Sequence, residues 1–255
     1  MSAIRYRETL WSEVYPGNQH TVRCLRPAVR GAEKALELAV AQRKRTVWRL
    51  DGGAGSDVHL QWLLDRDYHV MAKGMSNRRA GALARQVSRW DAYAGYWLGE
   101  VASPVDFGRP VRVFVKRRCK DSKFVHSYYI TTLSLPSKGH FLACYDQRGG
   151  AEVEQFRNDK SGLGLVARRK RSLMAQKGLV LLTDLAHNLL ADFYHHALVG
   201  TRFAGYGPKR IVRDLLATPG NLVLEAGELQ RIELLSLKQF SPELLICLER
   251  YCLGD

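Results

Sequence analysis

The amino-terminal third of the chain alternates between short apolar runs and amphipathic stretches. Apolar residues at alternate positions predict strands, and apolar residues three or four positions apart predict helices. This pattern predicts strands over residues 8–15, 46–50 and 68–73, and helices over residues 26–42 and 58–64. Strand, loop, helix and strand with short connections indicate a parallel α/β sheet, in which sites form at the carboxyl ends of strands. Asp51 stands at such an end, directly after residues 46–50.

The pattern changes in the middle and at the end of the chain. Residues 111–117 and 124–135 predict an antiparallel hairpin that turns at residues 120–123. Helical spacing follows over residues 145–160 and 171–198, and a strand pair is predicted at residues 221–225 and 229–234. The last predicted helix starts with Ser241 as cap, Pro242 at the first position and Glu243 behind it.

These changes divide a chain of 255 residues, which is long enough to bury a sizeable core in one or two domains. The predicted segments are a partial α/β sheet at 1–75, a β-rich insertion at 76–139, a helical part at 140–200, and a strand pair with a helix at 201–255. The longest apolar run, 178–190, is interrupted by polar residues, so no membrane span is predicted. The first residues lack the apolar stretch of a secretory signal.

The charge balance favours an acidic partner. The chain has 39 Lys and Arg against 25 Asp and Glu, a formal net charge of +14. Such a surplus attracts polyanions, of which nucleic acid is the commonest in a cytoplasm, although a solvated basic surface is the alternative. The basic residues gather at 43–49, 109–123 and 157–177. The five cysteines form no Cys-x2-Cys pair, which favours reduced thiols in a cytoplasmic protein over disulfides or zinc.

Three chemically active side chains share one face of the helix predicted over residues 145–160. At about 100° per residue, Tyr145, Arg148 and Glu152 fall within roughly 60° of one another. Phe156 shares the direction of Glu152, so this face looks inward or into a cleft, and the Glu152 carboxylate needs either Arg148 or a divalent cation as partner. Together with Asp51, Glu152 fits a two-metal phosphoryl-transfer site, in which carboxylates hold Mg²⁺ and basic residues hold phosphates.

The same residues match a family signature. Tyr145, Arg148 and Glu152 reproduce, in type and spacing, the first three members of Tyr-x2-Arg-x3-Glu-x6-Lys. Arg49-Leu50-Asp51-Gly52-Gly53 is similar to the strand end that carries the second catalytic Asp of that family. Further similarity lies at residues 63–66, 159–163 and 185–190. The sequence therefore resembles the carboxyl-terminal part of a DDE-type insertion-sequence transposase.

The resemblance implies a fold and an activity. The fold is α/β with a ribonuclease-H-like (retroviral-integrase-like) catalytic core, present in part, with a mostly β insertion and a helical carboxyl-terminal part. The activity is nicking of insertion-sequence ends and their transfer to target DNA, with Mg²⁺ or Mn²⁺ as cofactor. By the same resemblance Asp51 and Glu152 are catalytic metal ligands, and Tyr145 and Arg148 contact DNA.

Two features depart from the family pattern. The position seven residues after Glu152 is Asp159, and the lysine, Lys160, follows one residue later. The family also needs an Asp on the opening strand of the sheet, but residues 1–50 contain none. We therefore expect a transposase that is truncated at its amino end and has weak or no catalytic activity alone.

Two other hypotheses stay open. A non-catalytic fragment would bind DNA, or inhibit full-length transposase by pairing with it, and a homo-oligomer is a further expectation. Its DNA-binding residues would be Arg148, Lys160, Arg168, Arg169, Lys170 and Arg171. An unrelated basic α/β protein would show no DNA affinity at moderate salt. None of these hypotheses involves a membrane.

Overall fold

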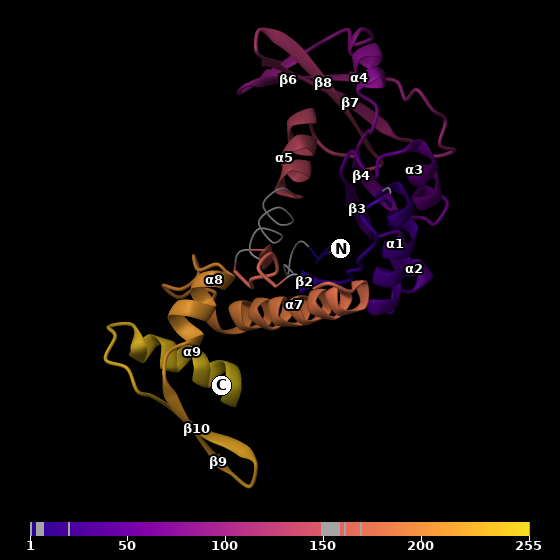
Figure 1. Cartoon of the computed structure of the whole chain (residues 1–255). Coiled ribbons are helices and arrows are strands. Elements are labelled where there is room, and N and C mark those ends of the chain that lie inside the picture. The colour runs from indigo at the N-terminus through magenta and orange to yellow at the C-terminus, as the bar shows by residue number, and fades with distance from the viewer. Residues whose placement is uncertain are drawn as a thin grey trace. The chain divides into compact units, whose positions relative to one another are not determined.

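In the computed structural model of this chain, the described residues are 2–3, 8–19, 21–148, 159–160, 162–168 and 170–254. They belong to two units, one spanning Tyr15–Gly149 and the other combining Met1–Val14 with Gly150–Asp255. Figure 1 shows the elements of both. The unit Tyr15–Gly149 contains a six-stranded sheet and the helices α1 to α5, and the other contains α7 to α9 with two short strand pairs.

A mixed sheet forms the centre of the unit Tyr15–Gly149, with strand order β3-β4-β8-β7-β6-β5. Its strands are β3 (Val47–Leu50), β4 (His69–Lys73), β5 (Asp91–Tyr93), β6 (Tyr96–Val101), β7 (Arg112–Lys120) and β8 (Lys123–Thr131). β3 and β4 run parallel, and the other neighbours in the sheet run antiparallel. The predicted α/β class, the strands predicted over residues 46–50 and 68–73, and the predicted hairpin are confirmed, but the sheet is mixed and not parallel throughout. Because β4 pairs with β8, the predicted segments 1–75 and 76–139 contribute to one sheet.

The β7–β8 hairpin closes through a two-residue turn. Lys120 lies opposite Lys123, and Asp121 and Ser122 between them have φ angles of 49° and 60°. A type I′ turn requires positive φ at both central residues, and its twist matches that of the flanking strands. This local geometry fixes the register of the two longest strands of the sheet.

Among the described residues, five α-helices accompany the sheet, and a 3-10 turn at Thr21–Cys24 precedes the first of them. They are α1 (Leu25–Ala35), α2 (Val40–Arg43), α3 (Asp57–Leu64), α4 (Asn77–Ala84) and α5 (Lys138–Arg148). The helix predicted over residues 58–64 is confirmed as α3, which connects the parallel strands. The continuous helix predicted over residues 26–42 is wrong, because Glu37 has a φ of 47° that a right-handed helix cannot include. The predicted strand over residues 8–15 is shorter than expected, since only β2 (Glu8–Thr9) forms there.

An aromatic core holds α5 on the sheet. Phe141 is fully buried, and its ring centroid lies 4.8 Å from Phe114 and 5.8 Å from Tyr129. Tyr145, one turn further along α5, stacks on Phe141 at 6.1 Å. Packing of this kind contributes both buried apolar area and favourable ring geometry. Helix α5 therefore begins earlier than the helix predicted over residues 145–160, whose part beyond Arg148 lies mostly outside the described residues.

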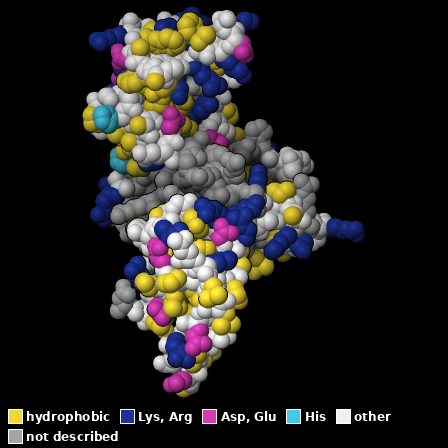
Figure 2. Space-filling view, turned by 90° about the vertical axis from the view of Figure 1, so that its left-hand side faces the viewer, with side chains coloured by type: hydrophobic (Ala, Val, Ile, Leu, Met, Phe, Trp, Pro, Cys, Tyr) yellow, Lys and Arg dark blue, Asp and Glu magenta, His cyan; other side chains and the backbone are white. Residues whose placement is uncertain are grey.

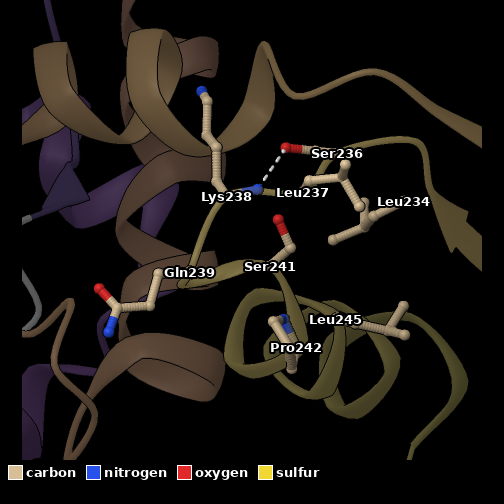
Figure 3. Close-up of a pocket in the computed structure, with 8 residues that line it drawn as sticks. All are labelled: Leu234, Ser236, Leu237, Lys238, Gln239, Ser241, Pro242 and Leu245. Atoms are coloured by element: carbon tan, nitrogen blue, oxygen red, sulfur yellow. Dashed lines mark hydrogen bonds between the residues drawn. The ribbon is translucent and has the colours of Figure 1, made fainter.

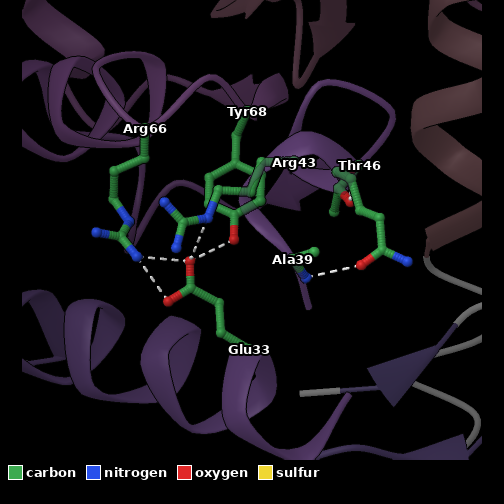
Figure 4. Close-up of polar contacts among 7 residues, drawn as sticks. Glu33, Ala39, Arg43, Thr46, Arg66 and Tyr68 are labelled. Carbon is green, nitrogen blue, oxygen red and sulfur yellow. Dashed lines mark hydrogen bonds and ion pairs between the residues drawn. The ribbon is translucent and has the colours of Figure 1, made fainter. Parts of the chain in front are cut away.

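An ion cluster ties α1 to the α3–β4 connection (Figure 4). Arg66 Nη2 donates to both carboxylate oxygens of Glu33, each at 2.7 Å, and the Tyr68 hydroxyl donates a short hydrogen bond to Glu33. Arg43 Nε lies 3.3 Å from the same carboxylate. Burial raises the pKa of Glu33, but the hydrogen bonds from Arg66 and Tyr68 outweigh burial and hold this pKa below its ordinary value of 4.5. These contacts therefore stabilise the folded protein when Glu33 is ionised.

The long helix α7 (Leu173–Phe193) dominates the other unit and continues into a π-helical turn at Tyr194–Leu198. The Ser172 hydroxyl caps α7 by accepting a hydrogen bond of 3.1 Å from the Ala175 N–H. The amino-terminal segment lies along this helix. Asn188 exchanges two hydrogen bonds with the backbone of Thr9, and Lys177 pairs with Glu13 at 2.7 Å. The helix predicted over residues 171–198 is confirmed.

The elements described after α7 are α8 (Pro208–Arg210), a π-helical turn (Ile211–Leu216), β9 (Gly220–Glu225), β10 (Glu228–Leu234) and α9 (Ser241–Leu253). Before α7, β1 (Ser2–Ala3) pairs with β2. The predicted strand pair and last helix are confirmed. The predicted cap is wrong, since Phe240 is the cap residue, Ser241 is the first helical residue and Pro242 is the second. Buried Phe203, Leu215 and Leu244 belong to the core of this unit.

Candidate functional site

Asp51 lies where its sequence position predicts, at the carboxyl end of β3. Its side chain is exposed, and its Oδ1 accepts a hydrogen bond of 3.0 Å from the Gly53 N–H. The Asp51 carbonyl oxygen also accepts from the Ala54 N–H at 3.2 Å. These bonds close a tight turn that presents the carboxylate to solvent at the end of the parallel strand pair. Such a position suits a metal or phosphate ligand in an α/β fold.

Two glycines hold this turn against the neighbouring strand. A Cβ atom at Gly55 would lie 1.9 Å from the Lys73 carbonyl oxygen, and one at Gly74 would lie 1.9 Å from the Tyr128 ring. Any other residue would force the backbone or a buried ring to move. Because Gly55 and Gly74 have no side chains, the loop from Asp51 to Gly55 can pack closely against the end of β4.

Tyr145 connects this strand end to α5. The Tyr145 hydroxyl donates a hydrogen bond of 2.9 Å to the Leu50 carbonyl oxygen, the residue directly before Asp51. The Tyr145 ring is 4% exposed and packs 4.9 Å from the ring of Tyr129. In this structure Tyr145 therefore supports the end of β3. Its predicted contact with DNA stays a prediction.

The other predicted site residues divide into two groups. Glu152 and Arg169 lie outside the described residues, and α5 ends at Arg148, whose side chain also lies outside them. Lys160, Arg168, Lys170 and Arg171 are exposed and belong to the unit that contains α7. The structure thus brings Asp51 and Tyr145 together. It leaves the predicted pairing of Asp51 with Glu152 untested.

Asp159, which stands seven residues after Glu152 in the sequence, is buried. Its Oδ1 lies 2.7 Å from Nδ1 of His187, which is 5% exposed. Asp184 lies one turn before His187 on α7. Burial raises the pKa of Asp184, a hydrogen bond with Ser12 opposes this shift, and the charge of Asp159 adds to it. Asp159 therefore contributes to the interior of its own unit.

A basic and aromatic cluster that sequence reasoning missed lies on β6, β7 and β8 and includes Trp90, directly before β5. The Arg117 guanidinium carbon lies 4.3 Å from the ring centroid of Trp90, 5.1 Å from Trp97 and 4.9 Å from Phe124. Among the described residues, Arg117 has no acidic partner, and its buried Nε has no hydrogen-bond partner. Burial and the charge of Arg117 lower the pKa of neighbouring His126.

The surroundings of this cluster are basic. Arg118, Lys120 and Lys123 are exposed along the same hairpin, and Phe124 is 53% exposed. Figure 2 shows Lys and Arg side chains at many places on one face of the molecule. Aromatic rings beside unpaired cations are the surface that unpaired nucleotides favour, since bases stack and phosphates pair with cations. The signal in the sequence was a pair of tryptophans, Trp90 and Trp97, followed by a run of basic residues over 116–123.

A groove at the start of α9 is a poor candidate for catalysis. It encloses about 490 Å³ between the end of β10 and α9 (Figure 3). Its lining residues are Leu234, Ser236, Leu237, Lys238, Gln239, Ser241, Pro242 and Leu245. This lining holds no carboxylate, imidazole or thiol that could bind a metal or move a proton. The groove therefore does not compete with the loop of Asp51 as a reaction site.

A metal site is not assembled from the described residues alone. Within them, no group of three or more His, Cys, Asp or Glu side chains is placed to hold a metal ion. The Asp51 carboxylate is an exposed oxygen ligand of the kind that Mg²⁺ prefers, but it is a single ligand. Glu152, the predicted second carboxylate, lies outside the described residues.

Comparison with known proteins adds no family. No protein-family model matches this sequence, and a search of curated proteins finds no match to it. Across the part of the chain that the structure describes, none of the helices has the length and apolar character needed to cross a membrane. The functional argument therefore depends on the residues themselves.

Replacing Tyr145 by phenylalanine tests its supporting role. The variant keeps the ring packing but leaves the buried Leu50 carbonyl without this donor. We expect the free energy of unfolding to fall by about 1 kcal/mol, the usual net value of one buried hydrogen bond. Urea denaturation measures this change. The matched control is Tyr93→Phe, in the same unit. A Tyr145→Phe variant as stable as the parent would show that the bond contributes nothing.

Proposed function

We propose that this chain acts on DNA as a DDE-type transposase with a ribonuclease-H-like core, and that Asp51 and Glu152 are its metal ligands. The observation that carries the proposal is the hydrogen bond from Tyr145 to the Leu50 carbonyl oxygen. It places the first residue of the Tyr-Arg-Glu signature beside the strand end that presents Asp51. Glu152, the third residue of that signature, follows Tyr145 by seven residues in the sequence.

The roles of the chain's own residues follow from their chemistry. Asp51 and Glu152 would hold Mg²⁺, which when bound would activate the attacking oxygen and stabilise the leaving one. Tyr145 keeps the end of β3 in place, and the turn at Gly53 orients the Asp51 carboxylate. Two carboxylates hold two divalent ions poorly, and residues 1–50 supply no Asp. We therefore propose that this polypeptide binds DNA but cleaves it weakly or not at all.

A second candidate function is DNA binding without catalysis. The cluster of Arg117, Trp90, Trp97 and Phe124 favours it, because it offers stacking surfaces and an unpaired cation away from any carboxylate pair. The net charge of +14 supports binding in both candidates. Metal dependence separates them, since only the first candidate needs Asp51 and Glu152.

Binding is tested by fluorescence anisotropy with labelled single-stranded and duplex DNA at increasing salt. We expect affinity to fall steeply as salt rises, because bound cations on DNA are released. Replacing Trp97 or Arg117 by alanine should weaken single-strand binding by roughly 5- to 150-fold, corresponding to about 1–3 kcal/mol per stacked base. The matched control is Arg45→Ala, an exposed arginine of the same unit. Equal losses in all three variants would reject the cluster as a binding surface, and no affinity at moderate salt would reject both candidate functions.

Catalysis is tested by nicking of supercoiled DNA with Mg²⁺ or Mn²⁺. We expect Asp51→Asn and Glu152→Gln each to reduce metal-dependent nicking to background while DNA binding stays equal or becomes tighter, because negative charge near phosphate is removed. Asp65→Asn, at an exposed carboxylate of the same unit, is the control and should nick as the parent does. Nicking that survives both substitutions would contradict the proposed ligands. Binding without nicking in the parent would favour the second candidate.

A further inference from the structure

One face of α7 is apolar and exposed. Its large residues are Met174 (74% exposed), Leu181 (59%), Leu182 (66%), Leu185 (57%) and Leu189 (56%). The opposite face is buried in its own unit through Thr183, His187, Leu190 and Ala191. A surface helix normally pairs one apolar face with one polar face, so a helix that is apolar on both sides has a second partner.

No charged side chain interrupts the exposed face between Met174 and Leu189. At about 100° per residue, Lys177 and Asp184 point roughly a quarter-turn or more away from the centre of this face. Both are also engaged in their own unit, Lys177 with Glu13 and Asp184 with Ser12. The apolar strip therefore extends over four turns of helix, about 22 Å.

The exposed positions of this strip are spaced equally on the two sides of the point between Leu181 and Leu182. Gly178 and Leu185 are equally far from that point, and so are Met174 and Leu189. A two-fold axis at that point would bring these positions of two antiparallel copies of the helix opposite one another, so that apolar residues meet apolar residues along the strip.

We propose that the exposed face of α7 pairs with α7 of a second copy of this chain, antiparallel and across a two-fold axis between Leu181 and Leu182. Gly178 would receive Leu185 of the partner subunit. The space above Gly178 is open, since a Cβ built there meets nothing within 4 Å. A small residue opposite a large one lets helices approach closely and interlock. Met174 would pack on Leu189 of the partner subunit.

The ends of the strip add charge complementarity. Arg171 is exposed before the first turn of α7, and Asp192 near its last turn keeps a side chain 44% exposed. Asp192 accepts a hydrogen bond from Tyr251 at 2.7 Å and lies 3.1 Å from His196, so its position is already fixed. In the antiparallel pair, Arg171 lies opposite Asp192 of the partner subunit at both ends. A parallel pair would place like charges together, which is unfavourable.

Sedimentation of the purified full chain without DNA tests the proposal. We expect the parent to be a dimer. Leu181→Glu combined with Leu182→Glu places four carboxylates at the two-fold axis and should raise the dimer dissociation constant at least about 100-fold, since like charges and lost burial act together. The control is Leu222→Glu with Leu224→Glu on β9, where the leucines are 66% and 59% exposed, and it should stay dimeric. Circular dichroism checks that each variant folds.

Two further variants keep the proposal testable if the double Glu variant does not fold. Gly178→Trp adds a bulky side chain in open space, so it should leave the monomer folded and raise the dissociation constant at least about tenfold. Leu181→Lys combined with Leu182→Glu should keep the dimer, because opposite charges meet across the axis only in the antiparallel arrangement. A monomeric parent, a monomer after the β9 substitutions, or a dimer unaffected by Gly178→Trp would overturn the proposal. A dimer lost in the Lys–Glu variant would overturn the antiparallel orientation.

Discussion

Replacing Phe141 by alanine is expected to lower the free energy of unfolding of the unit Tyr15–Gly149 by about 3–5 kcal/mol. Phe141 is fully buried, and its ring packs against Phe114, Tyr129 and Tyr145. The substitution removes these contacts and leaves a cavity between α5 and the sheet. Because domains of typical size have about 5–15 kcal/mol of stability, the loss would be a large share of the total.

Urea denaturation followed by tryptophan fluorescence measures this loss. Four of the five tryptophans, all except Trp11, belong to the unit Tyr15–Gly149, so the signal reports mainly on it. Phe124→Ala is the matched control, because Phe124 is 53% exposed, and it should lose no more than about 1.5 kcal/mol. Equal losses in the two variants would contradict the assignment of Phe141 to the core. In the Phe141→Ala variant Tyr145 also loses a stacking partner, which weakens the support of the Asp51 loop.

Replacing Glu33 by glutamine is expected to cost about 2–4 kcal/mol, because it leaves the Arg66 and Arg43 cations and the buried Tyr68 hydroxyl with a neutral partner. The effect depends on pH. The pKa of Glu33 is lowered in the folded protein, so the stabilisation is fully present above the unfolded value of about 4.5 and is lost as pH falls through the lower folded pKa. Stability of the parent should therefore fall steeply on acidification, and less steeply in Glu33→Gln.

The same cluster also makes the stability of the folded protein depend on alkaline pH, through the proton of Tyr68. Burial and hydrogen bonding to Glu33 raise the pKa of Tyr68 above its ordinary value of 10. The folded protein then holds the Tyr68 proton more tightly than the unfolded chain, so stability falls as pH rises above about 10. Urea denaturation at a series of pH values measures the loss of stability at acid and at alkaline pH. The control is Glu37→Gln, at an exposed position. An equal loss of stability at acid pH in the parent and in Glu33→Gln would contradict a role for this cluster.

Local pattern was sufficient to predict β3, β4 and the β7–β8 hairpin, because alternation and turn residues act over a few positions. It also placed Asp51 at the end of a parallel strand, since that depends only on the order of elements. The break between α1 and α2 was missed because it depends on the left-handed backbone at Glu37, a residue that otherwise tolerates helix well.

Contacts between distant residues could not be predicted in this way. The Tyr145 hydroxyl donates a hydrogen bond to the carbonyl oxygen of Leu50, 95 positions earlier. Helical periodicity predicts the helix face on which Tyr145 lies, but not the residue that it contacts. The cluster around Arg117 depends on strand register, because Trp97 lies opposite Arg117 only once β6 and β7 pair. The same holds for Asp159, whose burial follows from its contact with His187 on α7.

The close approach of Gly55 to β4 also gives a test of selection. A chain that had no further use for Asp51 would tolerate movement of this loop, and substitutions at Gly55 would accumulate. A chain whose loop still matters would keep Gly55, because a single added carbon collides with the Lys73 carbonyl oxygen. Gly74 would be kept in either case, because an added carbon there collides with the buried ring of Tyr128. Variation at Gly55 but not at Gly74 among close relatives would thus indicate loss of the site, independently of any assay of activity.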